Sequence, residues 1–125
     1  MIAHVTIHVN DFEKGKEFYS KALAPLGYKL TKDFPQWKAA GFVSGEGNTD
    51  FWLHADGAKQ PTHIAFTATS EEMAKEFYDA AIKAGGKDNG APGYRTEYGA
   101  GYYAAFVYDP DGHNIEAMYW NDSKK

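Results

Sequence analysis

Two histidines and one glutamate are the side chains of this chain that could share a metal ion. Segment 16–19 (Lys-Glu-Phe-Tyr) recurs 59 residues later at 75–78, and the same offset carries His4 onto His63. Two copies of one unit can face each other, which would make these histidines a pair in space. With the carboxylate of Glu116 they form the two-histidine, one-carboxylate set that suits Fe(II), and also Zn, Mn or Ni.

Glu116 lies in an apolar stretch, Ile-Glu-Ala-Met-Tyr at 115–119, which predicts a buried carboxylate. A buried charge requires a counter-ion or a metal. A histidine alone on a strand is ordinarily a packing or surface residue. The repeat and the buried carboxylate together favour a metal site here.

The elements that must position these residues occur twice. Residues 2–9 and 62–68 alternate as strands, which places His4, Thr6 and His8 on one face, and His63, Ala65 and Thr67 on the matching face. A helix follows each strand, with Asn10 and Thr69 as predicted N-caps and a glutamate three residues later in each copy. Glycines end both helices, at 27 and at 85–86.

Three strands are expected after each helix, so each copy is a βαβββ unit. They are 28–34, 37–44 and 50–55 in the first copy, and 95–99, 102–109 and 114–120 in the second. The Gly-, Asn- and Pro-rich segment 86–94 is expected to be an extra loop. The sequence thus predicts an α+β fold in one domain, 1–125, with units at 1–57 and 60–120.

Composition narrows the classes of partner. With 43% hydrophobic residues the chain is predicted to be globular, and its net charge of −4 with scattered Lys and Arg argues against nucleic acid. There is no apolar run of 18 residues to span a membrane. Met1 leads directly into a strand, which argues against a signal peptide, and the absence of cysteine fits a reducing cytoplasm.

The other histidines are given lesser roles. His8 follows His4 by four residues, about 13 Å along a strand, which is too far to share one ion. We therefore expect His8 to lie in or at the rim of a cavity. His54 and His113 fall near strand ends or turns and are expected on the solvated surface.

In combination, three motifs resemble the vicinal oxygen chelate superfamily, which includes glyoxalase I, extradiol dioxygenases, and fosfomycin- and bleomycin-resistance proteins. They are His4 ahead of Val9-Asn10-Asp11 and Phe18-Tyr19, then 61–66 (Pro-Thr-His-Ile-Ala-Phe), then 109–116 (Asp-Pro-Asp-Gly-His-Asn-Ile-Glu). The resemblance implies paired βαβββ units in a cupped, incomplete barrel with the helices outside. It also implies one divalent metal bound by His4, His63 and Glu116.

One position departs from that family. Glyoxalase I-like members usually add a Glu or Gln ligand on the fourth strand, where repeat symmetry with Glu116 places Trp52. Tryptophan does not bind metal, so the resemblance implies a three-ligand site, like those of the dioxygenases and fosfomycin transferases. Extradiol dioxygenases, however, usually carry two such modules per chain.

The resemblance assigns the metal a Lewis-acid role toward a substrate held through two adjacent oxygens. Beside Glu116, we expect Tyr98 or His8 to move protons. Aromatic side chains and one cation would line the substrate pocket: Trp37, Phe42, Trp52, Tyr102 and Arg95.

Three functions stay open. The first is a metal-dependent lyase, isomerase, dioxygenase or transferase acting on a small oxygenated molecule, aromatic ones included. The second is a metal-free protein that sequesters a drug or another small molecule, like the bleomycin-resistance branch. The third is a domain whose metal site is structural or vestigial. A cytoplasmic homodimer is expected in each case, because cupped sheets of this size commonly leave an apolar edge to cover.

Overall fold

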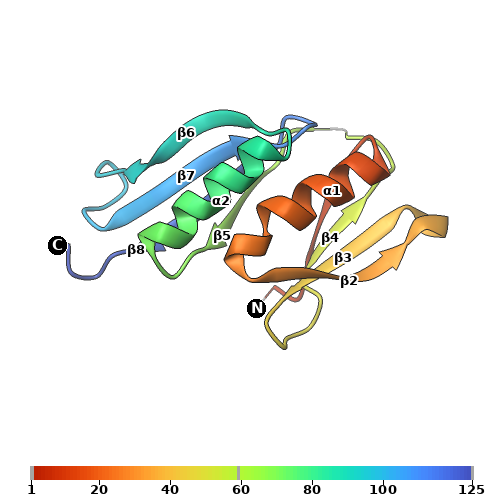
Figure 1. The fold of residues 1–125 in the computed structure, drawn as a ribbon, viewed down its shortest axis with the longest axis horizontal. Coiled ribbons are helices and arrows are strands. Elements are labelled where there is room, and N and C mark those ends of the chain that lie inside the picture. The colour runs from red at the N-terminus through yellow and green to blue at the C-terminus, as the bar shows by residue number, and fades with distance from the viewer. Residues whose placement is uncertain (1, 59, 125) are drawn as a thin grey trace.

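The computed structural model describes residues 2–58 and 60–124. It confirms the predicted fold class: two four-stranded mixed sheets, each with one helix, and no closed barrel (Figure 1). The first unit contains β1 (Val5–His8), α1 (Phe12–Ala22), β2 (Tyr28–Phe34), β3 (Ala39–Ser44) and β4 (Phe51–His54). The second contains β5 (His63–Thr67), α2 (Glu71–Lys83), β6 (Lys87–Tyr94), β7 (Tyr102–Tyr108) and β8 (Asn114–Trp120).

The two sheets have the same topology. Their strand orders are β1-β4-β3-β2 and β5-β8-β7-β6, and in each the first and last strands of the unit pair in parallel. The sequence repeat is therefore a structural repeat. Each helix covers one face of its own sheet and leaves the other face open.

Strand alternation separates the two faces as predicted. Ile7 on β1 and Val9 just after it are buried beneath α1, whereas Thr6 on β1 and His4 just before it are exposed. The helix lies very close to the sheet at Gly15, where an added Cβ would come within 3.1 Å of Val9 and 3.5 Å of Leu53. A larger residue at this position would push α1 away from the sheet.

Both predicted helix caps are wrong by one residue. Asp11, not Asn10, caps α1 by accepting a hydrogen bond from the Lys14 amide. Ser70, not Thr69, caps α2 in the same way, through the Met73 amide. Either neighbour satisfies the same side-chain preference, so the sequence could not separate them. Asn10 instead accepts a hydrogen bond from the Ala58 amide.

The predicted loop at 86–94 is also wrong. It forms β6, an edge strand paired with β7. An edge strand tolerates Pro92, which has no amide to donate, and the register shifts around Gly90 indicate bulges. The strand predicted at 95–99 is a turn instead, closed by a bond from the Tyr98 amide to the Arg95 carbonyl.

The two units share one hydrophobic core. Phe66 of β5 packs edge-on against both Tyr28 and Phe51 of the first unit. A buried hydrogen bond of 2.6 Å runs from the Tyr19 hydroxyl on α1 to the Asp109 carboxylate after β7. Helices α1 and α2 lie side by side above the two sheets (Figure 1).

His113 is part of this junction, which corrects its predicted place on the surface. It is 1% exposed, accepts a hydrogen bond from the Thr62 amide at Nδ1, and thus carries a proton on Nε2. That proton is donated to the backbone carbonyl of His8 at 2.7 Å. The turn before β8 therefore joins the two units.

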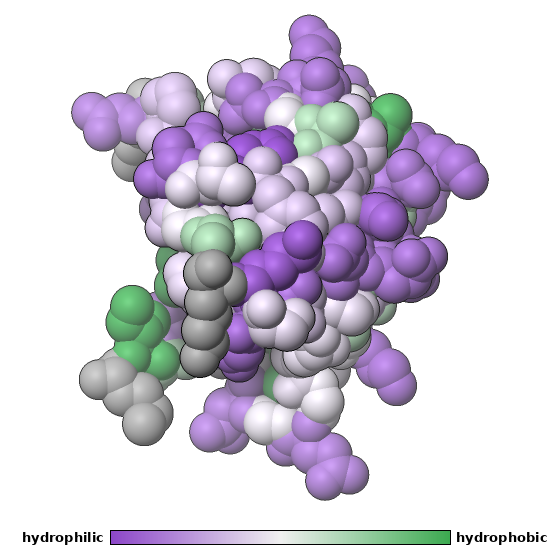
Figure 2. Space-filling model, turned by 90° about the vertical axis from the view of Figure 1, so that its left-hand side faces the viewer, coloured by the Kyte–Doolittle hydropathy of each residue, from purple (hydrophilic) through white to green (hydrophobic). Residues whose placement is uncertain are grey.

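The outer face of the second unit is largely hydrophilic, with strongly hydrophobic residues visible only in small separate patches (Figure 2). Within the described residues, no helix has the length and apolar character needed to cross a membrane.

Candidate functional site

The open face of the second unit holds a buried acid. The Glu116 side chain is only 3% exposed, and its Oε1 lies 2.8 Å from His63 Nε2. Its other oxygen, Oε2, accepts a short hydrogen bond of 2.5 Å from the Tyr102 hydroxyl. These residues line a cavity of about 410 Å³ together with Tyr98 and Phe106. The predicted pairing of a histidine with the buried Glu116 is present.

Tyr102 is held as a hydrogen-bond donor. Burial, followed by the hydrogen bond to Glu116, raises the pKa of Tyr102 to about 12. The hydroxyl therefore keeps its proton at neutral pH and fixes one oxygen of the carboxylate. The second oxygen is directed at His63, whose own side chain is 53% exposed.

The open face of the first unit is aromatic instead of acidic. A cavity of about 520 Å³ is lined by His4, Trp37, Trp52 and His54, with smaller neighbours. Phe34 stacks on Trp52 with the rings 19° from parallel, and it also contacts Trp37. This face could hold a flat apolar ligand.

Strand register places Trp52 at the repeat position of Glu116. Thr6 on β1 lies opposite Trp52, and its counterpart Ala65 on β5 lies opposite Glu116. The tryptophan that the sequence places at the repeat position of Glu116 is therefore a real difference between the two units.

Within one chain, His4 does not join His63 and Glu116. His4 lines the aromatic cavity and a second cavity of about 470 Å³ at the junction of the units, and neither is the cavity of Glu116. Over residues 2–58 and 60–124, these three side chains form no common cluster of potential ligands. Each open face therefore carries only part of the predicted ligand set.

Other predicted residues are distributed between these places. Tyr98 is 62% exposed and packs edge-on against Tyr102 in the Glu116 cavity. Arg95 lies above Phe106, which lines that cavity, and donates to the Ala91 carbonyl. Phe42 is fully buried in the core and lines none of the three cavities described above, which corrects its predicted place in the pocket.

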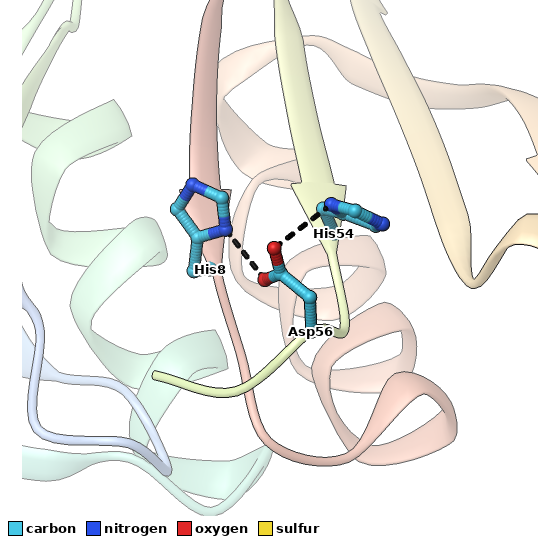
Figure 3. Close-up of side chains that lie close together, drawn as sticks. All are labelled: His8, His54 and Asp56. Atoms are coloured by element: carbon cyan, nitrogen blue, oxygen red, sulfur yellow. Dashed lines mark hydrogen bonds and ion pairs between the residues drawn. The ribbon is translucent and has the colours of Figure 1, made fainter. Parts of the chain in front are cut away.

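His8 lies away from Glu116 and is bound to a residue that the sequence did not single out. Its Nδ1 is 2.6 Å from Asp56 Oδ1, while His54 Nδ1 is 3.3 Å from Asp56 Oδ2 (Figure 3). The hydrogen bond from His8, together with the charges of both histidines, lowers the pKa of Asp56. Only the pairing of β1 with β4 brings these side chains together, so spacing along the chain gave no signal for them.

Comparisons with known proteins agree with this architecture. The model of the glyoxalase/bleomycin resistance protein/dioxygenase superfamily matches residues 1–117. An uncharacterized protein, YqjT, of Bacillus subtilis (strain 168) is 27% identical over 92% of this chain and 95% of its own length.

Solved structures give the same answer. A glyoxalase/bleomycin resistance protein from Albidiferax ferrireducens T118 is 28% identical with a TM-score of 0.79, over 95% of this chain and 98% of its own. A lactoylglutathione lyase from Agrobacterium tumefaciens, 16% identical with a TM-score of 0.71 over 95% and 92% of the two chains, shares the fold. The repeated units, the buried Glu116 and these matches together show that the chain belongs to the glyoxalase/bleomycin resistance protein/dioxygenase superfamily.

Proposed function

We propose that this protein is a divalent-metal-dependent enzyme of the glyoxalase/dioxygenase type, acting on a small oxygenated molecule in the cytoplasm. The observation that carries the proposal is the buried Glu116 carboxylate, with one oxygen facing His63 and the other held by Tyr102. Among the described residues, His63 is the only partner in an ion pair with this acid. A bound cation would offset the cost of burying the charge.

The donor atoms fit a first-row metal ion. Imidazole nitrogen and carboxylate oxygen are ordinary ligands of Fe, Zn, Mn and Ni. Adjacent ligands at about 2.0–2.2 Å from a metal lie roughly 3 Å apart, and His63 Nε2 and Glu116 Oε1 are 2.8 Å apart. Tyr102 would orient the carboxylate from outside the ligand set.

The third ligand, His4, would come from a second copy of the chain. Because each open face is lined by one unit alone, a homodimer that places the 1–57 face of one protomer over the 60–120 face of its partner would complete the site. Trp37 and Tyr98, each more than 60% exposed on these faces, are the large side chains that such a dimer would cover.

When bound, the metal supplies Lewis-acid chemistry to an oxygenated substrate. The chain's own residues would do the rest. Trp37 and Trp52 would form one apolar wall and Phe106 the other, and both would exclude water from the ligand. Tyr98 is the proton donor or acceptor best placed in the Glu116 cavity, because His8 is bound to Asp56 elsewhere.

A second candidate is a metal-free protein that sequesters a small molecule, as in the bleomycin-resistance branch. The aromatic cavity around Trp37 and Trp52 favours it, because this cavity does not need Glu116 to hold a flat ligand. The two candidates differ in whether the buried acid binds metal.

Elemental analysis of untagged protein, purified without chelators, tests the proposal. At the Glu116 site we expect near-stoichiometric Fe, Mn, Ni or Zn, counted as the metal that the parent holds and the Glu116→Gln variant loses. Glu116→Gln should bind that metal at least about tenfold more weakly with an unchanged circular dichroism spectrum, because a ligand is lost without loss of volume. Absence of metal in the parent, even after reconstitution, would favour the metal-free candidate.

Mixing two defective variants tests the shared site. His4→Ala and Glu116→Gln should each bind metal poorly at this site, yet dimers formed after joint refolding should recover up to about a quarter of the sites. Recovery requires that His4 and Glu116 act from different chains. If light scattering gives a monomer, or if mixing restores nothing while the parent binds metal, the shared site is excluded.

A further inference from the structure

We propose that His8, His54 and Asp56 form a second binding site, for a divalent transition-metal ion, separate from the ligand set of Glu116. The two imidazoles come from neighbouring strands and point toward the carboxylate between them (Figure 3). One ligand atom from each of the three residues lies within 4.8 Å of the other two. Small side-chain rotations would bring all three onto one ion.

The backbone fixes these three residues before any ion binds. His8 and His54 lie directly opposite each other in the parallel pair of β1 and β4. Asp56 follows on a segment tied to β1 on both sides, by bonds from the Val9 amide to the His54 carbonyl and from the Gly57 amide to the Val9 carbonyl. A site built this way loses little conformational freedom when it binds.

The chemistry of the donors defines the ion. Two imidazole nitrogens and one carboxylate oxygen suit Zn²⁺, Ni²⁺ or Cu²⁺, with water in the remaining positions. An imidazole that carries its proton on Nε2 offers the Nδ1 lone pair to a metal ion, and Nδ1 is the atom that each histidine directs at Asp56. The side chains are between 32% and 44% exposed, which leaves a path for the ion and for water.

The second unit, described throughout residues 60–120, has no counterpart of this cluster, so the cluster is not a consequence of the βαβββ repeat. The second unit carries Thr67 opposite Met118 at the positions equivalent to His8 and His54. His8 lies about 13 Å along β1 from His4, so the two histidines cannot serve the same ion. His54 also lines the aromatic cavity, so an ion here would fix one wall of that cavity.

The test uses the full chain in a His63→Ala/Glu116→Gln background, which removes the other ligand set. After stripping with chelator, calorimetric titration with Zn²⁺ alone should give close to one ion per chain, and thermal unfolding should shift upward with Zn²⁺. Adding Asp56→Asn or His54→Ala should weaken binding at least about tenfold and abolish the thermal shift.

Asp33→Asn is the matched control, because Asp33 is a carboxylate of the same unit that pairs with Lys16 instead of histidine. It should leave Zn²⁺ binding unchanged. No binding in the background variant would overturn the proposal. Equal binding with and without Asp56→Asn would also overturn it and leave an adventitious ion only. Loss of metal from the Glu116 site would not affect this result, so the two proposals fail independently.

Discussion

The open faces of the two sheets have the same strand topology, but the first is lined by aromatic rings and the second by a buried carboxylate. At equivalent register positions the first unit has Trp52 and the second has Glu116. The residue across the sheet changes in compensation: Gly41 lies opposite Trp52, whereas Phe106 lies opposite Glu116. A Cβ on Gly41 would come within 3.0 Å of the Trp52 ring, so the large ring requires the glycine. Exchange of volume between neighbouring strands therefore lets one scaffold hold either an aromatic ring or a buried carboxylate at this position.

The helices of the two units also place an equivalent tyrosine in different environments. Tyr19 and Tyr78 occupy the same position of the repeat, and each donates a hydrogen bond to an aspartate. Tyr19 is fully buried and bonds to Asp109 of the other unit, whereas Tyr78 bonds to the exposed Asp88 of its own unit. The tyrosine–aspartate hydrogen bond thus joins the two units in the first copy, whereas in the second copy it lies at the surface of one unit.

The largest expected effect is the difference in stability between variants of Tyr19 and Tyr78. Tyr19→Phe should lower the free energy of unfolding by about 2–3 kcal/mol, because it leaves the buried Asp109 carboxylate without a partner on Oδ2. Tyr78→Phe should cost less than about 0.5 kcal/mol, since water replaces its bond. Urea unfolding of both variants measures the difference. Equal losses would mean that the Tyr19–Asp109 bond does not join the units.

The next effect concerns the open faces. Tyr102→Phe removes the donor to Glu116 and should weaken metal binding about tenfold, which is typical of a residue that orients a ligand. Tyr78→Phe is the control, because it removes a hydroxyl that donates to Asp88 away from this cavity, and it should leave the affinity unchanged. Titration of both apo variants with the metal found in the parent measures the two affinities. An unaltered affinity in Tyr102→Phe would assign its hydroxyl a packing role.

The smallest effect is a dependence on alkaline pH. Burial, then the charge of Asp109, raises the pKa of Tyr19 well above its ordinary value of 10.0. Above pH 10 the unfolded chain loses this proton while the folded chain keeps it, so stability should fall as pH rises. Urea unfolding at neutral pH and above pH 10 should show a smaller loss in Tyr19→Phe than in Tyr78→Phe. Identical slopes would mean that other groups cause the alkaline loss.

The sequence by itself determined the repeat, the fold class, the strand faces and the pairing of His63 with Glu116. Each of these depends on periodicity or on one apolar stretch around a charged residue. Such patterns involve residues that are close together in the sequence, so they can be read without the structure. The edge strand β6 escaped detection because glycine, asparagine and proline indicate a loop unless a neighbouring strand supplies its hydrogen bonds.

Only the tertiary structure decided which distant side chains meet. His113, expected at the surface, is buried because the second unit docks its turn against the His8 carbonyl. His54 and Asp56 lie close to His8 because β1 pairs in parallel with β4. His4 and Glu116 ended on separate faces of one chain because the units pack through their helices and shared core. Strand alternation fixes the face on which a side chain lies, but docking of the units fixes what that face meets.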